Sequence, residues 1–424
     1  MVSNYPQVLF QNRKADRIAT LEEYRQSGGY EGLADALRRS SYKEVQQVLL
    51  DAVLLGRGGA AFPAGRKLMT VADDAPHPRY IVCNADEMEP GTFKDRVLIH
   101  ADPHMLIEGM IIAGYGAQAE KGVIFIRPEY ESAARILERE IKIAKEAGYL
   151  GKNILGNGYS LEIVVHRSAG RYICGEVTAQ LNALMGKRAN PQQPPPYPTE
   201  KGLWGKPTVL QNVETLACMP HILRNGSEWF KNLALTETGA GTKIFCVSGK
   251  IHSPGCYELP MGVRLSEIIE VHAGGMVEGS EYKACLPGGA STRFLPREFY
   301  DIEMDFDTLR NVGHRLGTGA IMVFDQKTCL VAATLNLVDF FARESCGWCT
   351  PCREGLPYIR DLLRRLEEGQ GEEDFIPTLQ QMSKHLWSSY CAFAPGAVSP
   401  VESLITYFAD EVREHISQKK CPFK

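Results

Sequence analysis

The sequence predicts an α/β protein with a mostly parallel sheet, followed by a small β-rich module and a C-terminal group of about four helices. Up to about residue 240, short apolar segments of strand character alternate with helical patterns, as is typical of a parallel α/β sheet. Strands with Gly-Gly turns follow from about residue 243, and beyond residue 336 only helical periodicity remains. The length of 424 residues fits about three domains of roughly 150 residues each.

The first part of the chain begins with polar helical segments. In Asp102-Pro103 an N-cap residue precedes a proline, which marks the start of a helix. The expected elements, in chain order, are helices over 21–28 and 42–55, a strand over 79–83, a helix over 103–116, a strand over 122–127, a helix over 129–148 and a strand over 161–166.

The second part begins with a Pro-rich loop over 186–209, whose proline density predicts a stiff, ordered cover. The β-rich module is expected to have strands over 243–249, 255–258 and 283–286 and a helix over 265–272. Apolar strand and helix character returns over 318–335, and the terminal helices are expected over 336–344, 353–368, 374–385 and 398–417, the count of a small bundle.

Composition excludes several classes of function. Forty-seven Lys plus Arg against 51 Asp plus Glu give a net charge of −4, which offers no bulk attraction to nucleic acid or anionic lipid. The most apolar segment, 104–119, contains Glu108 and is too short to span a bilayer, and the first seven residues lack the features of a secretory signal. We therefore expect a cytoplasmic protein with reduced thiols, no nucleic-acid partner and no membrane span.

The spacing of four of the 12 cysteines is the strongest signal. Cys346, Cys349 and Cys352 follow a C-x2-C-x2-C pattern, and Cys391 lies farther along; three clustered ligands plus one remote are typical of a [4Fe–4S] cluster. Zinc is the alternative, although structural zinc sites more often use two separated pairs of ligands. Thr350-Pro351 predicts an N-cap and the first residue of a helix, whose N-terminus suits an anionic cluster. The eight other cysteines are expected to be packing residues.

Two loops are candidates for a nucleotide site. Gly56, Gly58 and Ala61 match the relaxed dinucleotide fingerprint, but the loop follows a helix rather than a strand, so only a general cradle for a phosphate or a flat ring is indicated. A plain turn is the alternative. The acidic loop 84–89 follows the carboxyl end of a strand, where its carboxylates suit ribose or ribityl hydroxyls; a solvated turn paired with Lys94 and Arg96 is the alternative.

Taken together, these segments resemble the NADH-binding flavoprotein (51-kDa-type, F) subunit of bacterial respiratory complex I, NADH:quinone oxidoreductase. Related flavin subunits of NAD-linked hydrogenases and formate dehydrogenases share most of the motifs, and a divergent paralogue with altered nucleotide preference is a further alternative. The segment 392–398 is more similar to complex I. The matching strings lie at 56–60, 83–96, 170–176, 202–208, 212–216 and 344–355.

The resemblance implies an N-terminal helical segment (1–50), a Rossmann-like FMN- and NADH-binding domain (51–240), a ubiquitin-like β-grasp domain (241–325) and a four-helix bundle that binds [4Fe–4S] (326–424). NADH would give a hydride to FMN, and single electrons would pass to the cluster. The implied partners are a thioredoxin-like [2Fe–2S] (24-kDa-type) subunit and a large iron–sulfur (75-kDa-type) subunit, which would hold the chain at the cytoplasmic side of the inner membrane.

The resemblance also assigns site residues. Phe62, Glu89 and Tyr197 would bind NADH, and Glu176 would lie beside the flavin–nicotinamide contact as the catalytic position, with a helix N-terminal carboxylate as the alternative. Cys346, Cys349, Cys352 and Cys391 would hold the cluster. The FMN contacts would be Gly56, Arg57, Gly58, Lys67, Asn84, Asp86, Glu87, Tyr172, Gly175, Glu176, Asn212 and Thr215.

Four residues depart from the family pattern in the nucleotide site. Ala61 replaces a glycine, Val177 a glutamate, Pro194 a lysine and Gln211 an asparagine. A carboxylate near the adenosine ribose accepts hydrogen bonds from its hydroxyls and repels a 2′-phosphate. Val177 therefore predicts weaker NADH binding and poorer exclusion of NADPH.

Overall fold

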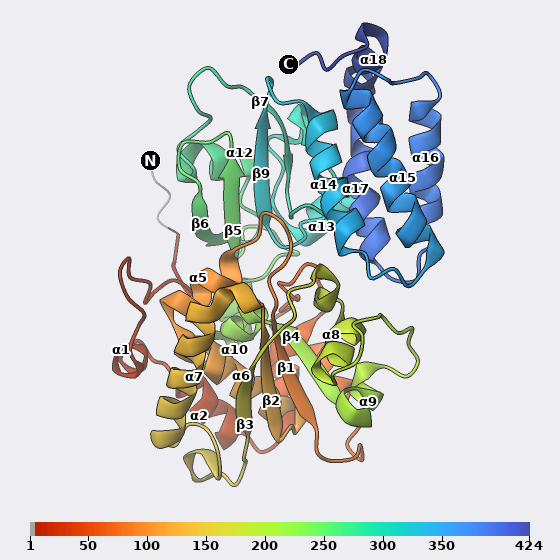
Figure 1. Cartoon of the computed structure of the whole chain (residues 1–424). Coiled ribbons are helices and arrows are strands. Elements are labelled where there is room, and N and C mark those ends of the chain that lie inside the picture. Colours follow the sequence, from red (N-terminus) through yellow and green to blue (C-terminus); the bar gives the residue numbers. More distant parts are fainter. Residues whose placement is uncertain (1–4) are drawn as a thin grey trace.

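The computed structural model describes residues 5–424. Residues 1–4, which belong to the predicted segment 1–50 and to the N-terminus considered for a secretory signal, lie outside the described residues. Residues 5–424 contain two sheets (Figure 1). One has four strands in the order β3-β2-β1-β4, and the other has five in the order β6-β5-β9-β7-β8. The strands are β1 (Tyr80–Ala85), β2 (Lys121–Ile126), β3 (Glu162–Arg167), β4 (Thr208–Asn212), β5 (Thr242–Gly249), β6 (Gly255–Pro260), β7 (Tyr282–Leu286), β8 (Leu295–Pro296) and β9 (Ala320–Asp325).

The four-stranded sheet is parallel throughout, as predicted from the alternating pattern. Its central strand pairs Tyr80 with Lys121 on one side and with Thr208 on the other. Ile81 and Val82 are fully buried on opposite faces, because helices or loops cover both sides of a parallel sheet. The predicted strands over 79–83, 122–127 and 161–166 are thus confirmed to within a few residues.

The helices around this sheet begin and end where local signals place them. The Asp102 side chain accepts a hydrogen bond from the Met105 backbone N–H at 3.4 Å, which confirms the predicted N-cap. The helices in this part are α1 (Leu21–Gln26), α2 (Glu31–Arg38), α3 (Tyr42–Asp51), α4 (Ala64–Met69), α5 (Lys94–Ala101), α6 (Pro103–Ala117), α7 (Glu131–Glu146), α8 (Val177–Leu184), α9 (Pro198–Lys201), α10 (Val213–Asn225) and α11 (Ser227–Lys231), with short turns η1 (Pro128–Tyr130), η2 (Ile154–Gly156), η3 (Tyr172–Gly175) and η4 (Leu203–Gly205).

The second sheet contains the three strands predicted for the β-rich module, adds β8, and includes β9, which lies in the segment 318–335 where apolar strand and helix character was expected. Strand β5 pairs antiparallel with β6 and parallel with β9. The helix predicted over 265–272 is a short α-helical turn that continues as a π-helical turn. The remaining elements here are α12 (Leu265–Glu267), η5 (Ile268–His272), η6 (Arg297–Phe299) and α13 (Phe306–Asn311).

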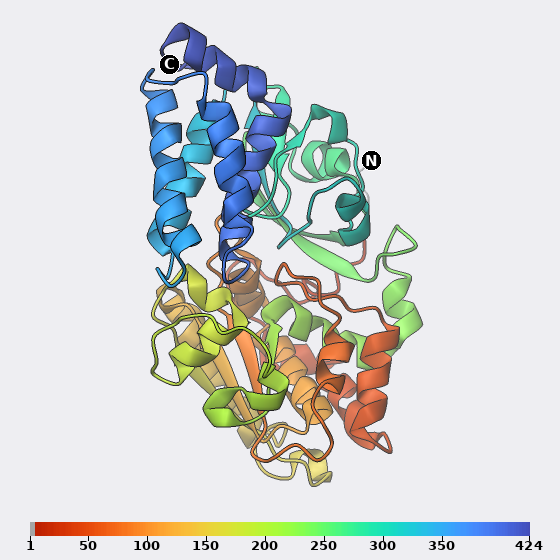
Figure 2. The same ribbon diagram turned by 90° about the vertical axis from the view of Figure 1, so that its right-hand side faces the viewer.

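The C-terminal helices lie beside the second sheet and above α8 and its neighbouring loops (Figures 1 and 2). Within residues 330–418 there are five, not the four expected: α14 (Leu330–Glu344), α15 (Thr350–Glu367), α16 (Phe375–Leu386), α17 (Phe393–Tyr407) and α18 (Ala409–Gln418). The single helix predicted over 398–417 is wrong, because Phe408 leaves the helical conformation (φ −129°, ψ 28°) and α18 packs back against α15 and α17. Among the described residues, no helix is both long and apolar enough to cross a bilayer.

A buried charge network joins the two sheets. Glu214 at the start of α10 accepts hydrogen bonds from Lys243 Nζ at 2.7 Å and from the Ile244 backbone N–H at 2.9 Å, both on β5. Lys94 Nζ lies 3.0 Å from the same carboxylate and donates to Asp95 Oδ1 at 2.6 Å. All four charged side chains are at most 4% exposed. Despite burial, which acts to raise it, the two lysines lower the pKa of Glu214 to about 2.

Candidate functional site

The carboxyl end of β1 carries three of the predicted flavin residues. Asn84 Oδ1 accepts a hydrogen bond from the Asp86 backbone N–H at 3.0 Å, and Ser168 Oγ donates to Asp86 Oδ1 at 2.7 Å. The other oxygen, Asp86 Oδ2, is buried without a partner among the described residues. Burial raises the pKa of Asp86 to about 6, so this carboxyl group is suited to face a hydrogen-bonding ligand at the sheet edge.

Glu87 has a different environment. Its carboxylate accepts hydrogen bonds from the Asp95 and Arg96 backbone N–H groups, at 2.9 and 3.2 Å, and from the Tyr130 hydroxyl at 3.2 Å. These N–H groups belong to the first turn of α5, where a helix has unsatisfied donors. Burial raises the pKa of Glu87 to about 7. The side chain thus holds the acidic loop against α5.

The glycine-rich loop packs closely against Asn212. A Cβ atom on Gly58 would lie 3.1 Å from Asn212 Cβ, so the close approach favours glycine. Asn212 is fixed in turn, because its Nδ2 donates to Asp95 Oδ2 at 2.7 Å and its Oδ1 accepts from Lys94 Nζ at 3.1 Å. The loop, the end of β4 and α5 therefore form one connected surface.

The Arg57 side chain points away from this surface into the protein. Its guanidinium donates to the Ala240 and Thr242 carbonyl oxygens at 2.7 and 3.2 Å, and the residue is 1% exposed. Its backbone N–H donates to Thr215 Oγ1 at 2.8 Å. Arg57 and Thr215 thus tie the glycine-rich loop to the molecule.

Lys67 on α4 lies beside the same loop. Its Nζ donates to the Leu210 carbonyl oxygen at 3.0 Å and lies 5.7 Å from the centre of the Phe62 ring. Burial lowers the pKa of this lysine to about 8. The group is therefore a cation near neutral pH, placed where an anionic ligand benefits from it.

Tyr172 and Glu89 form a pair that the sequence did not indicate. The Tyr172 hydroxyl donates to Glu89 Oε2 at 2.5 Å, and the Ser291 backbone N–H donates to Glu89 Oε1 at 2.7 Å. The Tyr172 ring packs edge-on against Phe340, Phe341 and Phe393 of the C-terminal helices. Glu89 thus contacts both η3 and the loop between β7 and β8. Ser291 lies in a turn with no motif, so no sequence signal marked it.

Glu176 occupies the N-cap of α8. Its Oε2 accepts hydrogen bonds from the Ala179 backbone N–H at 2.8 Å and from the Thr178 hydroxyl at 2.6 Å, which is the helix N-terminal arrangement considered as the alternative. Its charge also contributes to the raised pKa of Cys391, after burial. Next to it, apart from Gly175 and its two chain neighbours, no described residue has an atom within 4 Å of the position that a Cβ would take on Gly175, so the backbone here faces open space.

The other predicted NADH residues are exposed loop aromatics. Phe62 and Tyr197 are 43% and 55% exposed, and neither ring takes part in an aromatic pair among residues 5–424, although Lys67 Nζ lies near the Phe62 ring. Of the departures from the family pattern, Ala61 has a left-handed backbone (φ +55°), and Gln211 Nε2 donates to the Ala64 carbonyl at 3.3 Å. Val177 is the first residue of α8, and the Pro194 loop is anchored where Tyr390 Oη accepts from the Gln193 N–H at 3.2 Å.

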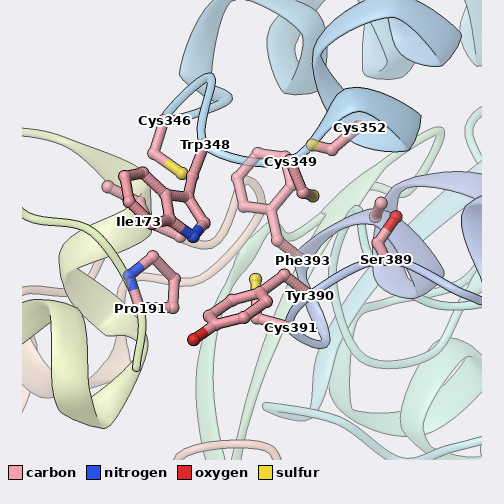
Figure 3. A pocket seen from close by; sticks show the side chains of 11 residues that line it. Ile173, Pro191, Cys346, Trp348, Cys349, Cys352, Ser389, Tyr390, Cys391 and Phe393 are labelled. Atoms are coloured by element: carbon pink, nitrogen blue, oxygen red, sulfur yellow. The ribbon is translucent and has the colours of Figure 1, made fainter. Parts of the chain in front are cut away.

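The four predicted cluster cysteines line one cavity (Figure 3). Cys346 and Cys349 precede α15, Cys352 lies in its first turn, and Cys391 approaches from the segment before α17. The helix begins at Thr350 with Cys349 as N-cap, so the predicted N-cap at Thr350 is one residue off. The other lining residues are Ile173, Pro191, Trp348, Ser389, Tyr390, Phe393 and Ala394.

The residues of this cavity fit an iron–sulfur cluster. Four sulfurs converge on a mostly apolar space beside a helix N-terminus, which suits an anionic cluster. A single tetrahedral zinc ion needs its ligand atoms close together. Among the described residues, the sulfurs of these cysteines do not belong to any set of three or more ligand atoms within 4.8 Å of one another. Burial raises the pKa of Cys352 to about 12 and that of Cys391 to about 11, so iron binding must displace thiol protons.

One short turn connects the two candidate sites. In η3, Tyr172 and Gly175 are predicted flavin residues, and Ile173 between them lines the cysteine cavity. The Tyr172 backbone N–H donates to Glu344 Oε2 at 2.9 Å, two residues before Cys346. Glu344 lies in the matching string 344–355, but its role was not predicted.

Comparisons with known proteins place these features in a family. Residues 49–221 match the family described as Nuo51 FMN-binding domain, residues 332–415 the NADH-ubiquinone oxidoreductase-F iron-sulfur binding region, and residues 244–295 the SLBB domain. The F subunit of NADH-quinone oxidoreductase from Escherichia coli (strain K12) is 49% identical over 401 residues, which cover 94% of this chain and 90% of that protein. The corresponding F 2 subunit of Rhizobium meliloti (strain 1021) is 44% identical, and the match covers 98% of this chain and 99% of that protein.

A solved structure shares the fold. In the crystal structure of an NAD+-reducing [NiFe]-hydrogenase in the H2-reduced state, the similar chain is 32% identical, with a TM-score of 0.83. The match covers 97% of this chain and 67% of that one.

Proposed function

Because this chain belongs to the family of F subunits of NADH-quinone oxidoreductase, we propose that its turn η3 connects an FMN site to the [4Fe–4S] site. The chain is the electron-entry subunit: it oxidises NADH with FMN and passes electrons to a [4Fe–4S] cluster. The identity of 49% to a quinone oxidoreductase subunit, against 32% to the hydrogenase chain, favours the former assembly over the latter.

The observation that carries the proposal is the shared turn. Gly175 and Tyr172 contact Asn84 and Glu89 of the acidic loop, Ile173 lines the cysteine cavity, and Glu344 holds the backbone of the turn. Electron transfer needs donor and acceptor sites at a fixed, short separation. A rigid turn common to both sites supplies that arrangement.

The proposed flavin surface consists of the sheet edge and the loops beside it. Gly56, Gly58, Asn84, Asp86, Lys67, Tyr172, Gly175, Glu176 and Asn212 would contact FMN, with Arg57, Glu87 and Thr215 holding the loops through the contacts described above. Asp86 Oδ2 is the acceptor available to a flavin donor, and Lys67 is the cation available to the anionic end.

For NADH, the proposed contacts are Phe62, Tyr197 and Glu89. The two exposed rings would stack on the adenine, and the remaining lone pairs of the Glu89 carboxylate would accept the ribose hydroxyls. Glu176, fixed as the N-cap of α8, would border the nicotinamide. Its carboxylate is already hydrogen-bonded, so it would position the substrate and not transfer a proton.

The chemistry divides simply between the cofactors and the protein. When bound, FMN takes two electrons as a hydride and releases them one at a time to a cluster that accepts single electrons. The residues of this chain hold the reacting partners in place: Asn212, Lys94 and Asp95 fix the loop surface, and Tyr172 excludes water by packing against three phenylalanines. No side chain is required to act as an acid or a base.

We further propose the domain boundaries 1–50, 51–240, 241–325 and 326–424, with a Rossmann-like nucleotide domain and a ubiquitin-like β-grasp module. Two breaks support these boundaries. The first comes after α11 and separates the two sheets, and the second lies between β9 and α14. Helices α14–α17 would form the four-helix bundle, because α14 packs on α15 and α17 and α16 packs on the same two, while α18 is an addition.

The proposed partners are a [2Fe–2S] 24-kDa-type subunit and a 75-kDa-type iron–sulfur subunit, which would hold the chain at the cytoplasmic side of the inner membrane. Trp348, 57% exposed beside two cluster cysteines, supports a partner near the cluster, from which electrons would leave.

The test is anaerobic purification of the full chain with iron, sulfide and FMN analysis, followed by NADH titration. We expect FMN, a [4Fe–4S] signal in electron paramagnetic resonance, and bleaching of the flavin absorbance by NADH. Cys391→Ser should lose most of the iron and keep FMN. The buried neighbour Cys174→Ser, which does not line the cavity, should keep both. Full iron in Cys391→Ser would contradict the ligand assignment.

A further inference from the structure

A second group of ligand-type side chains lies far from the cysteine cavity. Cys329, Glu367, His415 and Cys421 place their ligand atoms within 4.8 Å of one another, and all four residues are buried. Cys329 is the N-cap of α14, Glu367 the last residue of α15, His415 belongs to α18 and Cys421 to the tail beyond it. These four residues, called here the tail site, have no part in the flavin or cluster chemistry.

The contacts within the tail site are those of ligands around a common centre. Glu367 Oε1 lies 2.9 Å from Cys329 Sγ and 3.1 Å from His415 Nε2, and Cys329 Sγ lies 3.4 Å from His415 Nε2. Sequence distance is large, since the residues come from positions 329 to 421. Three helices and the C-terminal tail thus converge here, at the end of the molecule where α18 lies (Figure 1).

The surroundings orient the ligands for metal binding. His415 Nδ1 lies 2.8 Å from the Glu411 carbonyl oxygen and donates to it, so Nε2 is the nitrogen that faces Glu367 Oε1 and Cys329 Sγ. Lys424 Nζ lies 2.9 Å from Glu367 Oε2, which leaves Oε1 directed at the sulfur and the imidazole. A histidine with a backbone acceptor on its far nitrogen and a carboxylate held by a cation are the usual supports of a metal site.

We propose that Cys329, Cys421, His415 and Glu367 bind a structural Zn²⁺ ion. Two thiolates, one imidazole nitrogen and one carboxylate oxygen supply the four ligands of a closed tetrahedral site, and thiolate with imidazole favours zinc over calcium or magnesium. On binding, each thiol and the His415 Nε2–H that faces Glu367 lose their protons to solvent, and the metal keeps its charge, so no redox step is involved. Zn²⁺ with two thiolates and a carboxylate has a net charge of −1, which Lys424 offsets.

The consequence concerns the helix that carries the cluster ligands. Cys352 and Glu367 lie 15 residues apart on α15, so their backbones are about 22 Å apart at 1.5 Å per residue. The [4Fe–4S] ligands would hold the first turn of this helix, and zinc would hold its last residue to α14, α18 and the tail. The proposed ion is structural, and it does not depend on the assignment of the flavin residues.

The experiment is elemental analysis of the full chain, expressed with iron and zinc and dialysed against a chelator. We expect about one zinc per chain in addition to the iron. Cys421→Ser, a change in the tail beyond α18, should lower zinc at least tenfold and keep the iron. Cys352→Ser should lower the iron and keep the zinc. Cys256→Ser, which alters a buried thiol 3.6 Å from Cys246, should keep both metals.

X-ray absorption at the zinc edge on the unmodified chain provides a measurement independent of variants. A first shell of two sulfurs at about 2.3 Å and two nitrogen or oxygen atoms at about 2.0–2.1 Å supports the site. A shell of four sulfurs would place zinc at the cluster cysteines and overturn the proposal. So would zinc retained in Cys421→Ser, or a zinc-free chain with both thiols free or joined in a disulfide.

Discussion

The backbone N–H of Tyr172 donates a hydrogen bond to Glu344 Oε2 at 2.9 Å, and this bond links turn η3 to the last residue of α14, two residues before Cys346. The Arg171 guanidinium lies 3.2 Å from the same oxygen and donates to the Arg343 carbonyl at 2.7 Å. One half-buried carboxylate thus contacts both Arg171 and Tyr172 at the junction between the two sites.

Replacing Glu344 with alanine is expected to weaken this junction. The loss of a charge-assisted hydrogen bond should cost about 1.5–3 kcal/mol, while the partly exposed ion pair to Arg171 should add little. We expect a lower Tm and faster release of iron to a chelator. Glu354→Ala is the control, because that side chain is 68% exposed and pairs only with Arg353 among the described contacts. Equal effects of the two substitutions would contradict the role of Glu344.

Lys67 predicts a pH dependence of FMN affinity. Burial lowers the pKa of this lysine to about 8. The ammonium form, which attracts an anion, is therefore present below pH 8 and is lost as the pH rises through that value. FMN affinity should therefore fall above pH 8, by about tenfold toward pH 9. The measurement is fluorescence titration of FMN into the flavin-depleted chain between pH 6.5 and pH 9.

Lys67→Met should bind FMN weakly at every pH, without the decline above pH 8. The exposed Lys201→Met, on α9, should keep the unmodified profile. An unchanged profile in Lys67→Met would show that this lysine has no contact with the flavin.

Val177→Glu is expected to change the nucleotide preference. The substitution adds a carboxylate at the first residue of α8, beside Glu176, and a charge-assisted hydrogen bond to the ribose is worth about 1.5–3 kcal/mol, or one to two decades in affinity. The NADH to NADPH ratio of kcat/KM should rise by about 10- to 100-fold. Val164→Glu adds the same charge at an exposed position on β3 and should leave the ratio unchanged. If both variants behave alike, Val177 does not determine specificity.

Ala61→Gly is expected to stabilise the protein. Ala61 has φ +55°, a left-handed conformation that costs an L-residue about 1–2 kcal/mol, and glycine would remove this cost. Glycine also has greater freedom in the unfolded chain, which lowers the free energy of unfolding by about 0.5–1 kcal/mol. A net gain of about 0.5–1 kcal/mol should appear as a higher Tm. Ala60→Gly, at a neighbour without positive φ, should lower Tm. A lower Tm in both variants would contradict the strain at Ala61.

The features that the sequence predicted well depend on residues close together in the chain. The cap at Asp102 and the spacing of Cys346, Cys349 and Cys352 each involve residues a few positions apart, and the strand predicted over 79–83 was marked by a short local run of apolar residues. The parallel sheet was predictable for a similar reason, since alternating strands and helices permit few other arrangements.

The features that could not be predicted depend on contacts between distant residues. The position of the Arg57 guanidinium depends on the Ala240 carbonyl, 183 residues away. Nothing near Glu214 indicates Lys243 as its partner, and the tail site joins cysteines that looked like packing residues. At Phe408 the helical period continues through a real break, because packing of α18 on α15 and α17 overrides the local pattern.

The buried charge network of Lys94, Asp95, Glu214 and Lys243 has a kinetic consequence. Many enzymes open and close two domains around their substrate, and that motion sets the pace of turnover. Here such a hinge would pull Lys243 from Glu214 and leave unpaired ions in an apolar interior, at a penalty of about 3–5 kcal/mol. The network therefore holds the two sheets together, and we expect turnover without a hinge motion between them.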